Sequence, residues 1–261
     1  MTQLAIAIDG HLVPPGSIPQ IPLEDGLVRG DGVFEGMRQY QRVVRTLDWH
    51  LDRLQRSAGT IALPMDRALV QGELEEFTRH TTQADCNIRL MLTRGGRRIL
   101  REEPLFAPVE SWAIMPVQHR ATPLLDHAKT LSYAANMQAN RLAKAAGFDE
   151  ALFVRADDRA VMEAPTSSFC WLEGDAVVFP PLSIGILDSL TRRLVVEACP
   201  VRERVMPVEE LAGADGALLG STVMEARPVR AVGDLATFDV SSPRVRRVCD
   251  ALAEITRQRL G

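Results

Sequence analysis

The residue whose chemistry stands out in this sequence is Lys129. Of the 30 lysines and arginines, only Lys129 and Lys144 are lysines. Arginine replaces lysine well as a surface cation, but it cannot form an imine or carry a proton near neutral pH, whereas a desolvated lysine amine can. Lys144 precedes Gly147 in an alanine-rich stretch, where a cation favours a helix C-terminus. Lys129 has no such local explanation, so it is either a chance surface lysine or a reactive amine.

Other side chains could serve a ligand that has a ring nitrogen and an anionic group. Tyr133 lies four residues after Lys129. Glu163 is expected at a strand end, where a carboxylate either caps a turn or meets a protonated ring nitrogen. Residues 187–192 are expected to open a helix, and the free N–H groups at such an end bind anions. Arg53, on a helix flank, is either a solvated arginine or an anion ligand.

These parts suit pyridoxal 5′-phosphate. Its aldehyde needs a lysine, its pyridine nitrogen needs an acid to stay protonated, and its phosphate needs N–H groups, hydroxyls and an arginine. Two hydroxyl-rich turns are candidates for the hydroxyls: Thr166-Ser167-Ser168 and Ser221-Thr222.

Composition limits the class of protein. Hydrophobic residues make up 46% and charged residues 25% of the 261 residues, which is ordinary for a globular protein with a substantial core. A net charge of −4 with scattered arginines argues against a nucleic-acid binder. No segment is apolar enough to span a bilayer, and the N-terminus has no signal-peptide pattern. The four cysteines share no metal-ligand spacing, so we expect reduced thiols, no metal and a cytoplasmic location.

The first half of the chain predicts a small domain of strands and helices. Residues 4–8 read as a strand followed by an Asp9-Gly10 turn. A helix is expected over 47–61, capped by Thr46 or Asp48, and a second after Asp66 with Leu69, Val70, Leu74 and Phe77 as its buried side. Residues 87–93 and 112–117 read as strands, and the arginine-rich stretch 94–101 between them as a mobile loop.

The second half predicts a larger, β-rich domain. A helix over about 134–146 is followed by hairpins at 151–163 and 169–179, a helix after Ser189, a short helix at 207–211 and a C-terminal helix. The apolar positions of that last helix are Val245, Val248, Cys249, Leu252 and Ile255. We place the domain junction near residue 120, giving domains 1–120 and 121–261, the second carrying Lys129.

Several segments resemble the class IV aminotransferases, the fold-type IV pyridoxal-phosphate enzymes, in the order found in that family. The matching segments are Arg29-Gly30-Asp31-Gly32-Val33-Phe34-Glu35-Gly36, His50-Leu51-Asp52-Arg53-Leu54, Lys129-Thr130-Leu131-Ser132-Tyr133, Asp149-Glu150-Ala151-Leu152 with Glu163, Leu187 to Arg192, and Gly220 to Val229. The family includes branched-chain aminotransferase, D-amino-acid transaminase and aminodeoxychorismate lyase. The resemblance implies an α+β fold of two domains, and a homodimer.

The resemblance also implies residue roles. Lys129 would form the imine with pyridoxal 5′-phosphate and move the α-proton, Tyr133 would bind the cofactor's phenolic oxygen, and Glu163 its pyridine nitrogen. Arg53 would bind the phosphate. Further cofactor contacts are expected from Ser167, Ser168, Leu190, Thr191, Ser221 and Thr222. The substrate pocket would include Arg29, Phe34, Arg89 and Val223.

The subfamily signals conflict. Phe34 to Arg38 and Glu225 to Val229 look most like branched-chain aminotransferase, whereas Lys129 to Tyr133 looks closer to the lyase and D-amino-acid members. The sequence departs from the family at Arg29, where an aromatic residue is usual, at Ser189, usually glycine, and at Ser168, usually asparagine.

The leading hypothesis is therefore a transaminase acting on a small or branched-chain amino acid, L or D, and a 2-oxo acid. One alternative is a 4-amino-4-deoxychorismate lyase that releases pyruvate and 4-aminobenzoate. A second is a protein of this fold that binds cofactor or a partner without turnover.

Overall fold

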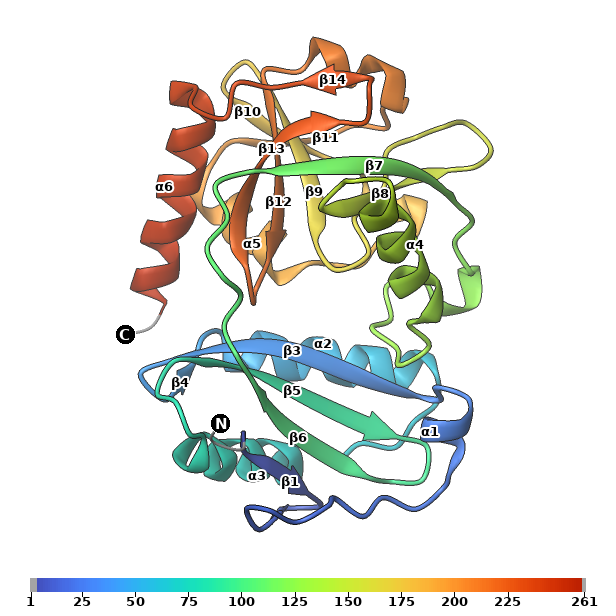
Figure 1. The fold of residues 1–261 in the computed structure, drawn as a ribbon, viewed down its shortest axis with the longest axis vertical. Coiled ribbons are helices and arrows are strands. Elements are labelled where there is room, and N and C mark those ends of the chain that lie inside the picture. Colours follow the sequence, from blue (N-terminus) through green and yellow to red (C-terminus); the bar gives the residue numbers. More distant parts are fainter. Residues whose placement is uncertain (1–3, 260–261) are drawn as a thin grey trace. The chain divides into compact units, whose positions relative to one another are not determined.

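The computed structural model describes residues 4–259. The chain divides into two compact units. Unit 1 comprises Met1–Phe106, Ala128–Tyr133 and Arg259–Gly261, and unit 2 comprises Ala107–His127 and Ala134–Gln258. Each unit contains a sheet and helices (Figure 1), so the predicted α+β class is confirmed.

Unit 1 is built on a six-stranded antiparallel sheet in the order β2-β1-β6-β5-β3-β4. Its strands are β1 (Ile6–Ile8), β2 (His11–Leu12), β3 (Gly32–Tyr40), β4 (Val43–Val44), β5 (Cys86–Thr93) and β6 (Arg98–Glu103). The predicted Asp9-Gly10 turn joins β1 to β2, and both turn residues have positive φ. A short helix, α1 (Asp25–Val28), precedes β3.

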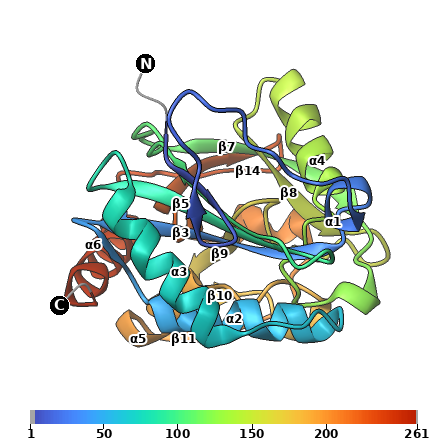
Figure 2. The same cartoon turned by 90° about the horizontal axis from the view of Figure 1, so that it is seen from below.

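Two helices, α2 (Leu47–Thr60) and α3 (Arg67–His80), cover one face of this sheet (Figure 2). The helix predicted after Asp66 is confirmed as α3, and Asp66 caps it by accepting from the Leu69 amide. Two local expectations were wrong. Thr46 is left-handed (φ +52°) and its side chain makes no cap bond to α2, because its hydroxyl donates to the Arg45 carbonyl instead. Leu69 is 45% exposed, because it lies off the stripe formed by Val70, Leu74 and Phe77.

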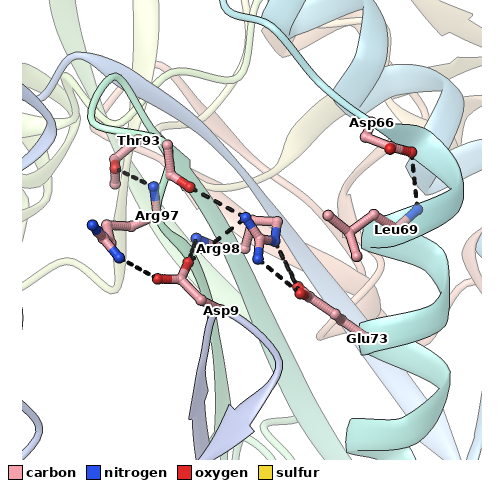
Figure 3. Close-up of polar contacts among 8 residues, drawn as sticks. Asp9, Asp66, Leu69, Glu73, Thr93, Arg97 and Arg98 are labelled. Atoms are coloured by element: carbon pink, nitrogen blue, oxygen red, sulfur yellow. Dashed lines mark hydrogen bonds and ion pairs between the residues drawn. The ribbon is translucent and has the colours of Figure 1, made fainter.

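The arginine-rich stretch 94–101 is not a mobile loop, since β6 begins at Arg98 and pairs with both β5 and β1. Figure 3 shows what holds its turn. Arg97 and the Arg98 amide donate to Asp9, while the Arg98 guanidinium donates to Glu73 of α3 at 2.8–3.0 Å. The arginines that suggested a solvated loop are therefore the groups that fix the hairpin.

Unit 2 contains an eight-stranded sheet in the order β11-β10-β9-β12-β13-β7-β8, with β14 paired to β13. Its strands are β7 (Trp112–His119), β8 (Glu150–Arg155), β9 (Ser168–Glu173), β10 (Ala176–Phe179), β11 (Val201–Glu203), β12 (Gly216–Ser221), β13 (Glu225–Val232) and β14 (Ala236–Thr237). The helices are α4 (Ala134–Ala145), α5 (Leu190–Ala198) and α6 (Pro243–Gln258), with 3₁₀ turns at Pro123–Leu125, Leu182–Ile184 and Val208–Gly213.

Most of the expected elements of unit 2 are confirmed, including the β9–β10 hairpin and the Ser189 cap of α5. Residues 159–163 fold back onto β8 as predicted, since the Phe153 amide donates to the Glu163 carbonyl and the Met162 amide to the Phe153 carbonyl, each at 2.9 Å. They form isolated bridges, Val154↔Val161 and Ala160↔Pro207, in place of a continuous strand. In α6, Cys249 and Ile255 are only partly buried, and Thr256 is buried in addition to the three predicted aliphatic residues. All four cysteines are unpaired thiols. Within residues 4–259, no helix is long and apolar enough to cross a membrane.

The division between the units differs from the predicted junction at residue 120. Strand β7 belongs to unit 2 because it pairs with β8 and β13. The Ala128–Tyr133 segment belongs to unit 1 because Thr130 bridges to Val33 of β3. Lys129 is thus held by unit 1, although the segments that flank Ala128–Tyr133 on both sides belong to unit 2.

Candidate active site

Lys129 lies in a short segment that runs beside the start of β3, whereas β4 pairs with the end of that strand. The Phe34 amide donates to the Lys129 carbonyl at 2.9 Å, and the Leu131 amide donates to the Gly32 carbonyl at 2.8 Å. On the other side, the Lys129 amide donates to the Ser57 hydroxyl of α2 at 3.0 Å. The backbone of the candidate lysine is therefore bonded to two separate elements of unit 1.

The glycines before β3 make room for this segment. Gly30 has φ +71°, and a Cβ there would lie 3.2 Å from the backbone of Ser132. A Cβ on Gly32 would lie 2.3 Å from the Leu92 carbonyl oxygen and 2.6 Å from Leu131. Glycine permits a tight turn or a close approach of the backbone to another group. The observed close approach is to the segment that carries the lysine.

Three predicted site residues gather around the aromatic ring of a fourth, Phe34. The Lys129 Nζ lies 4.4 Å from the centroid of the Phe34 ring and 5.7 Å from that of Tyr133. The two rings meet edge to face at 5.2 Å. The Arg89 guanidinium lies 5.2 Å from the Phe34 centroid and donates two hydrogen bonds to Glu103. An aromatic face attracts a cation, so Phe34 holds the amine beside Tyr133.

Arg53 belongs to a buried cluster with Glu35 and His50. Its Nε and Nη2 each donate to Glu35 at 2.7 Å, and His50 Nδ1 lies 2.7 Å from the same carboxylate. All three residues are at most 5% exposed. Burial alone would raise the pKa of Glu35, but Arg53 and His50 outweigh it and lower the pKa to about 2. Glu35 is therefore a permanent anion that fixes Arg53 on α2.

Arg29 does not join this group. Its side chain is 71% exposed and pairs with Asp25 at 2.7 Å, one helical turn earlier.

In unit 2, Glu163 lies in the chain just before the hydroxyl-rich turn. Its Oε1 accepts from the Leu187 amide at 3.0 Å, which ties it to the segment leading into α5. The turn itself is closed by the Ala164 amide, which donates to the Ser167 carbonyl at 2.9 Å. Asn136 of α4 donates to the Pro165 carbonyl. The carboxylate predicted to meet a ring nitrogen is thus fixed beside the segment that opens the predicted anion-binding helix.

The first turn of α5 combines N–H groups with buried hydroxyls. Ser189 caps it by accepting from the Arg192 amide, and the Leu190 side chain is buried, so only the backbone of Leu190 could bind a ligand. A Cβ on Gly220 of β12 would lie 2.7 Å from the Thr191 methyl, so the glycine permits this packing. The Thr191 and Ser167 hydroxyls are buried and have no hydrogen-bond partner within residues 4–259.

The two serines that depart from the family pattern in unit 2 contact each other. Ser189 Oγ donates to Ser168 Oγ at 3.2 Å, and Ser168 Oγ donates to the Gly220 carbonyl at 2.9 Å. One substitution is therefore accommodated by the other, since each hydroxyl finds its partner in this chain.

The remaining predicted residues lie at the β12–β13 turn. Ser221 Oγ accepts from the Met224 amide at 3.2 Å and shapes the turn. Thr222 is buried and Val223 partly buried. Unit 2 thus gathers Glu163, two hydroxyls without partners and a helix N-terminus, which is the donor set expected for a ring nitrogen and a phosphate.

The family profile of class IV amino-transferases matches residues 32–232, which is most of the chain. The chain belongs to the class IV aminotransferases. Class IV aminotransferases are enzymes that use pyridoxal 5′-phosphate, so this is the cofactor that the family indicates.

Relatives with different activities resemble this class IV chain about equally. It is 28% identical over 255 residues to a Methanocaldococcus jannaschii protein provisionally assigned as a branched-chain-amino-acid aminotransferase, covering 87% of each chain. It is 25% identical to the aminodeoxychorismate lyase of Bacillus subtilis, covering 85% of each. It is 26% identical to the D-alanine aminotransferase of Bacillus licheniformis, covering 89% of this chain and 90% of that protein.

Solved structures give the same fold. A PLP-bound hypothetical aminotransferase from Mycobacterium tuberculosis superposes with a TM-score of 0.89 at 23% identity, covering 97% of this chain and 99% of that one. The branched-chain aminotransferase of Thermoproteus uzoniensis with norvaline gives 0.87 at 26% identity, covering 98% and 95%. The predicted fold-type IV architecture of this class IV chain is therefore confirmed.

Sequence reasoning missed three residues of the site. Glu35 and His50 stand in segments that match the class IV pattern, but nothing local showed that they bind Arg53. Ser57 gave one usable signal, because it lies four residues after Arg53 and so on the same face of α2.

Proposed function

We propose that this chain is a pyridoxal-phosphate-dependent transaminase that moves an amino group from a small or branched-chain amino acid, L or D, to a 2-oxo acid. The observation that carries the proposal is the environment of Lys129. Its backbone is bonded to β3 and α2, and its amine lies 4.4 Å from the Phe34 ring centroid, beside Tyr133. A surface lysine needs no such support.

Lys129 has two tasks in this proposal. Its amine would hold the aldehyde of the bound cofactor, and the same amine, when free, would take the proton from the α-carbon of the amino donor. When bound, the cofactor supplies the aldehyde and a protonated ring that takes up the electrons left by that proton. Tyr133 would donate to the phenolic oxygen, and Phe34 places its ring 4.4 Å from the amine.

The other residues hold the two ends of the cofactor. Glu163 keeps the ring nitrogen protonated. The N–H groups of Leu190 and Thr191, with the hydroxyls of Thr191, Ser167 and Thr222, bind the phosphate together with Arg53, while Ser168 and Ser221 shape the surrounding turns. The hydroxyls of Thr191 and Ser167 support this role, because buried hydroxyls that have no partner in the described chain are costly unless a ligand satisfies them.

We assign the substrate side to Phe34, Arg89 and Val223. Arg89 lies over the same ring as the Lys129 amine and is a cation suited to a substrate carboxylate. Arg29 is the weaker member of the predicted set, since it is exposed and paired with Asp25.

A panel of L- and D-amino acids tests the proposed reaction. Each is added to the purified, cofactor-loaded protein, and the cofactor absorbance is followed before and after a 2-oxo acid is supplied. We expect a donor-dependent absorbance change that the 2-oxo acid reverses, with formation of the corresponding new amino acid. Pyruvate release from aminodeoxychorismate, with no response to any amino acid and 2-oxo acid pair, would establish the lyase instead.

We also propose a homodimer. Four aliphatic side chains stand out from the segment around α1, with exposures of 60–83%: Ile18, Leu23, Leu27 and Val28. Clustered exposed apolar residues favour burial against a partner. Sedimentation should give the mass of a dimer, and Leu23→Glu should shift it toward the monomer; a monomeric wild type would reject the proposal.

A further inference from the structure

We propose that Ser57 is a positioning residue that fixes the backbone of Lys129 and so the direction of its amine. The inference rests on the proposed function, in which Lys129 links to the cofactor. Ser57 is 1% exposed, and its Oγ accepts the Lys129 amide at 3.0 Å, 72 residues away in sequence. The Ser57 hydroxyl therefore connects α2 to a distant part of the chain, since this hydrogen bond satisfies no backbone group of α2 itself.

The two elements that grip Lys129 are themselves locked together. Arg53, one turn before Ser57 on α2, donates two hydrogen bonds to Glu35, which follows Phe34 in β3. The Phe34 amide in turn holds the Lys129 carbonyl. Ser57 and Phe34 therefore hold the amide and carbonyl of the same residue from elements whose spacing is fixed by a buried ion pair.

A second clamp holds the far end of α2. The Arg94 guanidinium donates to both oxygens of Asp31 at 3.0 Å, and to the carbonyls of Ile61 and Ala62 at 2.6 and 2.9 Å. Asp31 separates the two glycines that pack on the Lys129 segment. The end of α2 and the glycine run are thus joined, which keeps Ser57 in register with the lysine.

The test uses two matched variants of the cofactor-loaded protein, Ser57→Thr and Ser57→Val. They have nearly the same shape and differ in the oxygen that accepts the Lys129 amide. If valine or threonine disturbs folding, Ser57→Ala replaces Ser57→Val as the variant without the oxygen, because alanine is no larger than serine. Thr60→Val is the control on the same helix, since the Thr60 hydroxyl is exposed and bonds only locally to the Arg56 carbonyl.

Three measurements distinguish a positioning role of Ser57 from a role in stability alone. We expect kcat to fall about tenfold to a hundredfold in Ser57→Val and Ser57→Ala, with KM little changed and Ser57→Thr near wild type. The pH midpoint of the cofactor absorbance should shift in the variants that lack the oxygen and not in Ser57→Thr or Thr60→Val. Borohydride should still label Lys129 in all of them, because the amine is retained.

The outcomes are distinguishable. If Ser57→Val or Ser57→Ala is labelled at Lys129 and keeps the wild-type kcat and pH midpoint, the role of Ser57 is overturned while the proposed function stands. If borohydride labels no residue, or one other than Lys129, in the wild type, the proposed function fails and the role of Ser57 fails with it.

Discussion

The two units hold their functional side chains in different ways. In unit 1, Arg53 and the Lys129 backbone find partners within the protein, from Glu35 and from Ser57. In unit 2, the hydroxyls of Thr191 and Ser167 are buried and, among the residues that the structure describes, lack partners. The first set is aligned by the protein itself, whereas in the proposed function the second would be satisfied by the cofactor phosphate.

Two buried glutamates, one in each unit, also differ in the partners that surround them. Glu35 in unit 1 is 0% exposed and Glu150 in unit 2 is 1% exposed. The pKa of Glu35 is lowered to about 2, because Arg53 and His50 outweigh burial. The pKa of Glu150 is raised, because burial outweighs the hydrogen bonds from Thr166. Equal burial thus gives opposite shifts, and the partner decides the sign.

The largest expected effect is on the lysine of unit 1. Lys129→Ala should fold and lose about ten-thousandfold in turnover, since it removes the covalent link and the base that moves the proton. A steady-state assay measures the turnover, and borohydride reduction followed by peptide mapping tests the loss of the covalent link. Lys144→Ala is the matched control for both. A borohydride-stable label in Lys129→Ala would contradict the assignment of the lysine.

The next effect is on the ion pair of unit 1. Glu35→Gln leaves Arg53 as a buried cation without its anion, and should lower the free energy of unfolding by about 3–5 kcal/mol at neutral pH. Because the pKa of Glu35 is about 2 in the folded protein against 4.5 ordinarily, this stability is complete above pH 4.5 and is lost as the pH falls toward 2. Urea unfolding of both proteins across this range should show the difference shrinking; a constant difference would reject the pairing.

The same contrast explains what the sequence could predict. Features set by neighbours along the chain were readable, such as the Ser189 cap of α5 and the Asp9-Gly10 turn between β1 and β2. The reactivity of Lys129 and anion binding at the start of α5 stay predictions. Features set by distant residues were not readable. The Lys129 segment pairs with β3 almost a hundred residues away, and the Glu35–Arg53 pair joins a strand to a helix. Such contacts depend on register and packing, which local spacing does not encode.

A smaller effect is expected at the hydroxyls of unit 2. Thr191→Val removes a buried hydroxyl that has no partner in residues 4–259, so the unfolding free energy of the cofactor-free protein should rise by about 1–3 kcal/mol. Cofactor affinity should fall about tenfold to a hundredfold, because a hydrogen bond to a phosphate is lost. Titration with pyridoxal 5′-phosphate measures this, and Thr191→Ser should restore binding. An affinity unchanged in Thr191→Val would remove Thr191 from the phosphate site.

The smallest effect is expected at the buried glutamate of unit 2. Glu150→Gln keeps an oxygen for the Thr166 amide and removes only the charge, so the unfolding free energy should change by about 1 kcal/mol. A raised folded pKa means that the contribution of Glu150 is complete below pH 4.5 and is lost as the pH rises through the folded pKa. As the pH rises from 4.5, the free energy of unfolding of Glu150→Gln should therefore increase relative to that of the wild type. For Glu35→Gln, the same difference should become more unfavourable as the pH rises from 2 to 4.5. Urea unfolding of both variants at matched pH values measures these differences. If the difference for Glu150→Gln changes with pH in the same direction as that for Glu35→Gln, Glu150 is held as an anion.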